Sequence, residues 1–147
     1  MVSTTDQIYV IDEPTEKIEK VYNLKGAKGA ISIAYAPEEK LLFVVSQSTD
    51  NLQILDATDG KLKADVKVGA GPLAVVWEPV RKLAYVANRG SDSVAVVDVN
   101  GNLVANLPGG SYANHVFTDG KGTVWSVNKA RGLNDPQGDH ISRYAAK

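Results

Sequence analysis

The sequence predicts an all-β fold. Three observations support this class: apolar runs are only four to six residues long, they are rich in Val and Tyr, and turn-forming residues separate them. Their pattern also recurs at a fixed spacing of 42 residues, shown most fully by Pro72–Val99. A repeat of this length with four strands in each copy is typical of a β-propeller blade. The chain is therefore expected to be a partial β-propeller of about 3 to 3.5 four-stranded antiparallel blades.

Identical residues at the 42-residue spacing define the repeat. The identical pairs are Pro37 and Pro79, Lys40 and Lys82, Leu41 and Leu83, and Asp56 and Asp98. A single blade cannot bury both faces of its sheet, so blades stack and share a core with their neighbours. A sandwich of Greek keys is the alternative fold, but it would not require the same residues at a constant spacing.

The strands are expected in four groups within a single domain, 1–147. Residues 7–24 would form a partial blade, 31–68 and 73–107 complete blades, and 114–147 a final partial blade. This division gives thirteen strands. An enlarged loop, 129–140, stands where the earlier blades have short turns.

Turn and packing residues follow from the same division. Pro79, Gly90 and Gly101 mark turns because proline lacks an N–H and glycine accepts unusual backbone angles. An aspartate ends the third strand of successive blades and is expected to bond nearby backbone N–H groups: Asp12, Asp56 and Asp98. Aromatic residues of the first strands are expected to pack between blades: Tyr35, Trp77 and Phe117.

The segment Tyr85-Val86-Ala87-Asn88, followed by Ser93–Asp98, resembles the signature of the bacterial YVTN-repeat β-propeller family. A drifted copy occupies 43–56, and the last hundred residues look most like the C-terminal half of YncE-like propellers. The resemblance implies a blade and carries no catalytic residue. Relatives of this kind are commonly exported, so the resemblance implies a periplasmic protein, whereas a chain complete as given would be cytoplasmic because it lacks an export signal.

Composition narrows the classes of function. The formal net charge is −1, which argues against binding of nucleic acid or membrane by bulk electrostatic attraction. The chain has no cysteine, which excludes disulfides, thiolate catalysis and cysteine-bound metals. No apolar stretch approaches the length of a membrane span, so no membrane partner is expected.

The small number of blades predicts that the chain associates with a partner. Thirteen strands are too few to close a ring, and an open stack leaves apolar faces and unpaired strand edges in water. We therefore expect either a homodimer or additional blades that complete the ring.

A ligand site is expected where the connections between blades meet the turns that join second to third strands. In propellers these loops share one face, which often holds a binding site, an expectation based on fold analogy. The candidate residues on this face are Arg89, Tyr112, Asn114, Lys129 and Arg131. Cations beside an aromatic ring could hold an anionic ligand or single-stranded DNA. Solvated surface charge is the alternative.

No catalytic constellation, metal site or cofactor is predicted. The two histidines, His115 and His140, match no ligand spacing even with Asp135 and Asp139 nearby in the sequence. Related propellers that hold redox cofactors leave a redox or metal-associated domain as a further alternative. The sequence favours a non-enzymatic scaffold that binds a ligand or partner through loops on one face, with nucleic-acid binding as the first alternative.

Overall fold

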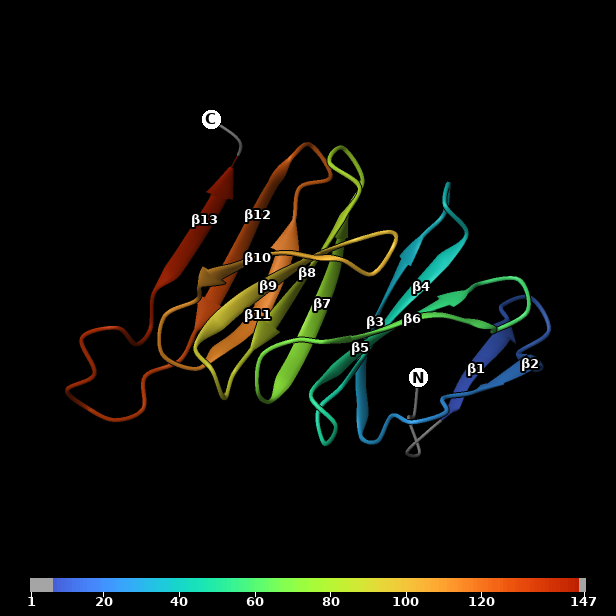
Figure 1. Ribbon diagram of the computed structural model, residues 1–147, viewed down its shortest axis with the longest axis horizontal. Helices are drawn as coiled ribbons and strands as arrows, with labels where there is room; N and C mark the ends of the chain where they lie inside the picture. The colour runs from blue at the N-terminus through green and yellow to red at the C-terminus, as the bar shows by residue number, and fades with distance from the viewer. Residues whose placement is uncertain (1–6, 146–147) are drawn as a thin grey trace.

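A computed structural model describes residues 7–145 of the protein, and within that range all regular secondary structure is β-strand. Four antiparallel sheets follow one another along the chain (Figure 1). The strands are β1 (Gln7–Asp12), β2 (Lys17–Asn23), β3 (Ala30–Ala36), β4 (Leu41–Ser46), β5 (Asn51–Asp56), β6 (Leu62–Lys67), β7 (Pro72–Glu78), β8 (Leu83–Asn88), β9 (Ser93–Asp98), β10 (Leu103–Pro108), β11 (Ala113–Thr118), β12 (Thr123–Asn128) and β13 (Ile141–Ala145). The all-β fold class is confirmed, and residues 7–145 contain no helix that could cross a membrane.

Each sheet is a meander in which strands adjacent in sequence pair with each other. The sheets β3–β6 and β7–β10 are complete four-stranded blades. The sheet β1–β2 supplies the third and fourth strands of a blade, because Asp12 ends β1 as Asp56 ends β5. The sheet β11–β13 supplies the first three strands. The blades form an open arrangement with a partial blade at each end (Figure 1).

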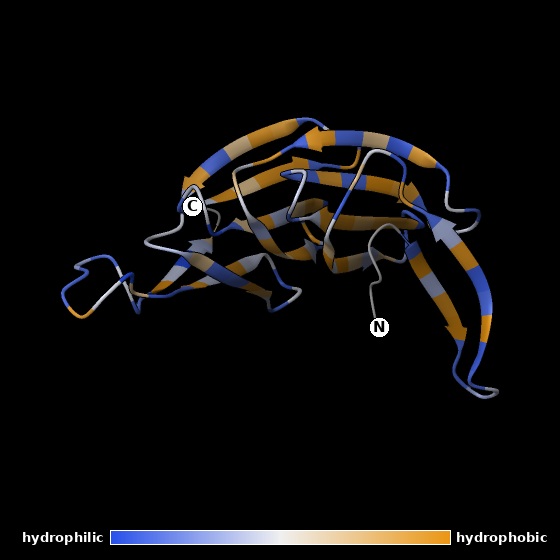
Figure 2. Ribbon diagram, turned by 90° about the horizontal axis from the view of Figure 1, so that it is seen from below, coloured by the Kyte–Doolittle hydropathy of each residue, from blue (hydrophilic) through white to orange (hydrophobic). Residues whose placement is uncertain are grey.

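The hydrophobic core lies between the blades. Hydrophobic and hydrophilic residues alternate along several strands (Figure 2). In β8, which is buried on both faces, Ala84 and Val86 belong to one core cluster and Tyr85 and Ala87 to the next. In the first interface, between β3–β6 and β7–β10, Phe43 of β4 stacks on Trp77 of β7. In the second, Tyr85 of β8 packs in one cluster with Val116 of β11 and Val124 of β12. Each blade is thus stabilised by contacts with its neighbours.

A buried carboxylate joins the second and third blades. Glu78 at the end of β7 is 0% exposed. Its Oε1 accepts from the backbone N–H of Gly122 at 3.0 Å, and its Oε2 accepts from that of Arg81 at 2.8 Å. The guanidinium of Arg81 donates to the hydroxyl of Tyr85 at 3.0 Å and to the carbonyl of Gly122. These hydrogen bonds fix the turn between β11 and β12 against the neighbouring blade.

The aspartates that end the third strands close turns, as their positions predict. Asp56 Oδ1 accepts from the N–H of Thr58 at 2.9 Å, and Asp98 Oδ1 accepts from the N–H of Asn100 at 2.9 Å. Asp98 also binds the side chain and backbone N–H of Asn102, which lower the pKa of the Asp98 carboxyl below its ordinary value. Their role is structural.

The expectation that three first-strand aromatics pack between blades holds only for Trp77. Phe117 is 61% exposed and lies opposite Trp125 on the outer side of the last blade. The prediction was wrong by one residue, because Thr118 occupies the register position that Trp77 has in the second blade. Tyr35 does occupy that position but is 54% exposed, since within 7–145 no first or second strand precedes β1 to cover it.

Candidate functional site

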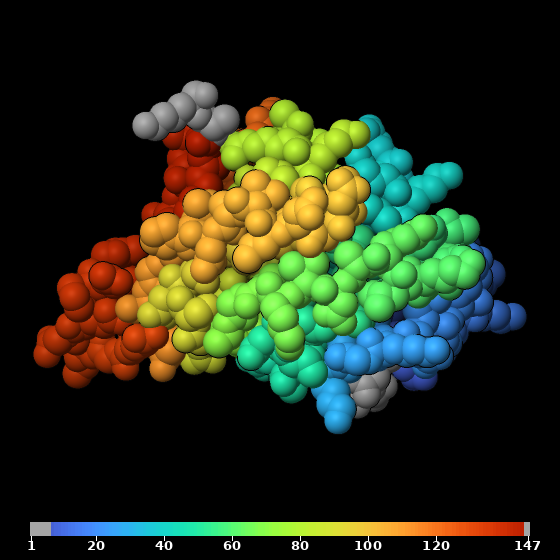
Figure 3. Space-filling model, in the orientation of Figure 1, coloured from blue at the N-terminus to red at the C-terminus, as the bar shows by residue number. Residues whose placement is uncertain are grey.

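Two sets of loops meet along one edge of the stack. The turns from second to third strands are hydrogen-bonded to the connections that enter the first strands. Thus the N–H of Arg89 donates to the carbonyl of Gly71 at 3.0 Å, and the N–H of Lys129 donates to the carbonyl of Ser111 at 3.1 Å. The enlarged loop between β12 and β13 projects at the C-terminal end of this edge (Figure 3). The predicted juxtaposition of these loops is therefore present.

An aspartate in each of the two short turns holds the entrance to the next blade. Asp50 Oδ1 accepts from the N–H of Gly71 at 2.8 Å, and Asp92 Oδ1 accepts from the N–H of Tyr112, also at 2.8 Å. Both aspartates have φ of 53°. The two interfaces therefore use the same contact, and Asp92 fixes the backbone of Tyr112.

Tyr112 has a left-handed backbone at a position that the earlier blades give to glycine. Its φ is 50°, while Gly71 has φ of 60° and Gly29 has φ of 71° at the entrances to β7 and β3. A residue with a Cβ in this conformation costs roughly 1–2 kcal/mol that glycine avoids. Six other non-glycine residues of the described range also have positive φ, but Tyr112 is set apart because it takes a position that the two earlier blades give to glycine.

Two arginines lie against that ring. The guanidinium carbon of Arg89 is 4.7 Å from the ring centroid of Tyr112, and that of Arg131 is 4.8 Å from it. Both distances are within cation–π range. Arg131 also donates to Asp92 Oδ2 at 2.5 Å. Arg89 forms no ion pair with any residue in 7–145, so its charge and hydrogen-bond donors are available to a ligand.

The enlarged loop is held by its own carboxylates. Asp135 Oδ2 accepts from the N–H of Arg131 at 2.9 Å, and Oδ1 accepts from that of Gln137 at 3.0 Å. These bonds lower the pKa of the Asp135 carboxyl, chiefly through the contact with Arg131. Asp139 Oδ1 accepts from the N–H of Ala130 at 3.1 Å. The loop therefore presents Arg131 from a defined backbone.

The five predicted site residues separate into three groups. Arg89, Tyr112 and Arg131 come together, and we call them the arginine–tyrosine cluster. Lys129 is next to it through its backbone, which also donates to the carbonyl of Tyr112 at 3.2 Å. Asn114 is exposed in β11, and its side chain makes no hydrogen bond to the cluster among residues 7–145.

Sequence reasoning missed Asp92, which binds both the backbone of Tyr112 and the side chain of Arg131. A signal for it exists, because Asp92 follows Asp50 at the 42-residue spacing of the repeat. The histidines lie apart from the cluster, with His115 in β11 and His140 before β13. Within the described range, no three His, Asp or Glu side chains are grouped as metal ligands would be.

The cluster has the chemistry of an anion site. A guanidinium offers paired donors that match a carboxylate or phosphate, and stacking on a ring holds its plane. Asp92 neutralises one of the two arginines. The arginine–tyrosine cluster and Asp92 together therefore carry a net positive charge.

Comparison with known proteins identifies the fold. No family model and no curated protein matches the chain. Among solved structures, Kuenenia stuttgartiensis hydrazine synthase superposes with a TM-score of 0.78 and 20% identity over 87% of this chain and 37% of that one. A chain of the mitotic checkpoint complex gives a TM-score of 0.78 and 14% identity, covering 97% of this chain and 44% of that one. This chain spans less than half the length of either, and both have β-propeller-type folds, so it is a stack of propeller-type blades.

Proposed function

We propose that this chain is a non-enzymatic binding scaffold that holds an anionic ligand or partner at the arginine–tyrosine cluster. One observation carries the proposal. Arg89 and Arg131 flank a tyrosine ring at a backbone position where the two earlier blades have glycine. A glycine at position 112 would serve the fold at lower cost, as it does at the entrances to β3 and β7.

A phosphate or carboxylate group is the favoured ligand chemistry. Arg89 has no carboxylate partner in the described range, and Arg131 has one, Asp92, with which a ligand would compete. Single-stranded DNA is the second candidate, supported by the exposed Lys129 beside the two arginines, since cations in a row can follow a phosphate backbone.

Calorimetric titration with inorganic pyrophosphate and with a short oligodeoxythymidylate tests the proposal. Arg89→Ala is expected to weaken pyrophosphate binding by about tenfold or more, because a charge-assisted hydrogen bond contributes roughly 1.5–3 kcal/mol. Lys121→Ala, which removes an equal charge from a different turn, is the control and should bind as the unmodified protein does. If both variants lost the same affinity for pyrophosphate, binding would depend on net charge rather than on a defined site, and the proposal would be contradicted.

The two ligands separate the two candidates. If the affinity for pyrophosphate greatly exceeds the affinity per phosphate of the oligonucleotide, the natural ligand is a small discrete anion. Binding of the oligonucleotide alone, with a steep dependence on salt, would favour the nucleic-acid function.

The wider context of the scaffold belongs to the same proposal. We place the chain among the YVTN-repeat propellers on the strength of Tyr85–Asn88 and Ser93–Asp98, and in the periplasm, as such relatives commonly are. The ring is completed by further blades, whether from a second copy or from additional chain. Cell fractionation with an antibody against the protein would test the compartment.

A further inference from the structure

The two ends of the stack are complementary in strand content. At the N-terminal end, β1 and β2 form the third and fourth strands of a blade whose first two strands are absent from the described residues. At the C-terminal end, β11 and β12 are a first and second strand. The first and second strands that one end lacks are therefore present at the other end, where β12 is also paired with a third strand, β13.

The same relationship holds for the aromatic stack between blades. Inside the chain, Trp77 of a first strand stacks on Phe43 in the second strand of the preceding blade. Tyr35 has the register position of Trp77, opposite Leu42 as Trp77 is opposite Ala84. Trp125 has the position of Phe43, three residues before the end of its strand. Each end of the stack thus presents one member of this aromatic pair.

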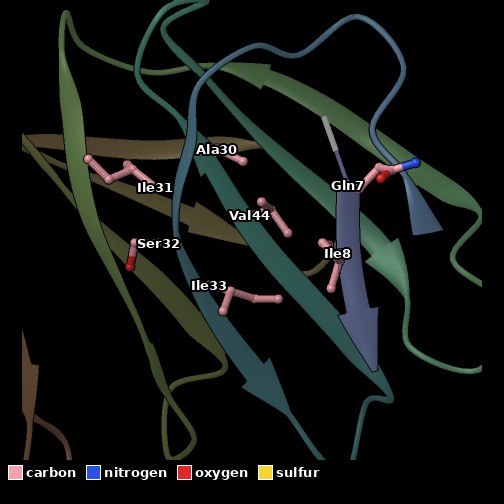
Figure 4. Close-up of a pocket in the computed structure, with 7 residues that line it drawn as sticks. All are labelled: Gln7, Ile8, Ala30, Ile31, Ser32, Ile33 and Val44. Atoms are coloured by element: carbon pink, nitrogen blue, oxygen red, sulfur yellow. The ribbon is translucent and has the colours of Figure 1, made fainter. Parts of the chain in front are cut away.

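Apolar surface surrounds both aromatic residues. On the outer side of the last blade, Trp125 lies with exposed Phe117, Val127 and Ile141. At the other end, a groove of about 260 Å³ opens between β1 and the sheet of β3 and β4 (Figure 4). It is lined by Gln7, Ile8, Ala30, Ile31, Ser32, Ile33 and Val44. The groove lies where the missing strands of the first blade would be.

We propose that a second copy of this chain docks head to tail on this groove. In this arrangement β11 and β12 of one copy complete the blade that begins with β1 and β2 of the next. The strand β12 pairs with the free edge of β1, and Tyr35 stacks on Trp125. The occupant is a second copy because the strands, the faces and the aromatic partner that the groove requires are all present at the other end of this chain.

Two such contacts between two copies close a ring. Each copy contributes two complete blades and one shared blade, which gives six blades, within the range of about four to eight that propellers use. The contact is heterologous, and two of them related by a twofold axis leave no free end.

Both β13 at one end and β1 at the other have the position of a third strand, and the shared blade has room for only one of them. We assign that position to β1. Ile8 of β1 is buried against Val44 and Leu55, and β1 ends on an aspartate as β5 and β9 do. The strand β13 has no fully buried residue and lacks the aspartate. The strand β13 is therefore displaced when the copies join. The pairing of β12 with β1 replaces the backbone hydrogen bonds of β13, while the bond from the Tyr144 hydroxyl to the carbonyl of Pro108, 2.7 Å long, is given up.

Sedimentation and cross-linking test the docking. The mass in solution is expected to be twice 15.7 kDa. Since the chain has no cysteine, Tyr35→Cys and Trp125→Cys proteins can be mixed and oxidised. The mixture should give a covalent dimer that neither protein gives alone. Val80→Cys, exposed on the turn between β7 and β8 and on neither docking face, should give none with Trp125→Cys.

A second variant protects the test against poor disulfide geometry. Tyr35→Glu should weaken the dimer by about tenfold or more, since a charge would enter an apolar contact, whereas Val80→Glu should leave it unchanged.

The outcomes separate this inference from the proposal on which it rests, that further blades complete the ring. A dimer that does not form the mixed cross-link, and whose affinity is unchanged by Tyr35→Glu, would overturn this docking alone. A monomer at every concentration overturns the second copy as the source of those blades. Neither result bears on pyrophosphate binding by the arginine–tyrosine cluster, which lies on a different edge.

Discussion

Trp77 stacks on Phe43 across the interface between the two complete blades, with ring centroids 5.0 Å apart and planes inclined by 16°. Both side chains are buried in the largest core cluster. Trp77→Ala should therefore lower the free energy of unfolding by about 3–5 kcal/mol, because it leaves a cavity between two blades that cannot close around it. Urea denaturation followed by circular dichroism measures the change.

Tyr35→Ala is the matched control for that measurement. Tyr35 occupies the same register position one blade earlier but is exposed, so truncation should change the stability of the dilute protein by less than about 0.5 kcal/mol. Equal losses in the two variants would show that the cores between blades do not dominate stability.

Tyr112→Gly should separate stability from binding. Glycine adopts the left-handed backbone without strain, so the free energy of unfolding should stay the same or rise by about 1 kcal/mol. Binding of pyrophosphate should fall, because Arg89 and Arg131 lose the ring that positions them. Thermal denaturation and calorimetry on the same sample measure both effects. A variant that is less stable and binds normally would refute the assignment of Tyr112 to the site.

Glu78→Ala should destabilise the protein by roughly 3 kcal/mol or more. The carboxylate is fully buried and accepts from the N–H groups of Val80, Arg81 and Gly122, and each N–H that loses its partner in a buried site costs about 1–3 kcal/mol. Amide exchange should accelerate at Gly122, on the neighbouring blade. If exchange increased only within β7 and β8, the carboxylate would not join the blades as described.

Acid should destabilise the turns that follow the strand-ending aspartates. Hydrogen bonds, first of all from the side chain of Asn102, lower the pKa of Asp98 in the folded protein below its ordinary value of 3.8. A carboxyl with a lowered folded pKa adds stability above the unfolded pKa and loses that contribution as the pH falls through the folded value. Stability should therefore decline as the pH falls below about 4, and the decline should be shallower in Asp98→Asn. Melting temperatures measured across this range would test it, and identical curves for both proteins would contradict it.

The fold could be predicted from the sequence because one spacing orders the whole chain. The 42-residue repeat places Tyr85 on Phe43 and Asp98 on Asp56, and these positions recur in the sheet register. The prediction failed where the repeat shortens. Trp125 follows Tyr85 by only 40 residues, and the same offset leads from Trp77 to Phe117, whereas Thr118, which has the register position of Trp77, follows it by 41.

The site could be predicted only as a set of loops. Topology alone brings the loops that carry Arg89, Tyr112 and Arg131 to one edge, but the sequence contains no sign that both guanidinium groups lie on the tyrosine ring. Asn114 lies in β11 rather than in the connection before it, so it is set apart from the arginine–tyrosine cluster. The burial of Glu78 could not be predicted, because an acidic residue before a proline is typical of an exposed turn.

The distribution of the core among three separate clusters determines how this molecule comes apart. Each cluster belongs to one pair of neighbouring sheets, so no single nucleus holds every strand. Thermal fluctuation should open the terminal sheets first, while β3–β6 and β7–β10, each packed on both sides, persist longest. A pull on the chain ends would therefore meet stepwise resistance, with the pair of complete blades as the last mechanical element to yield.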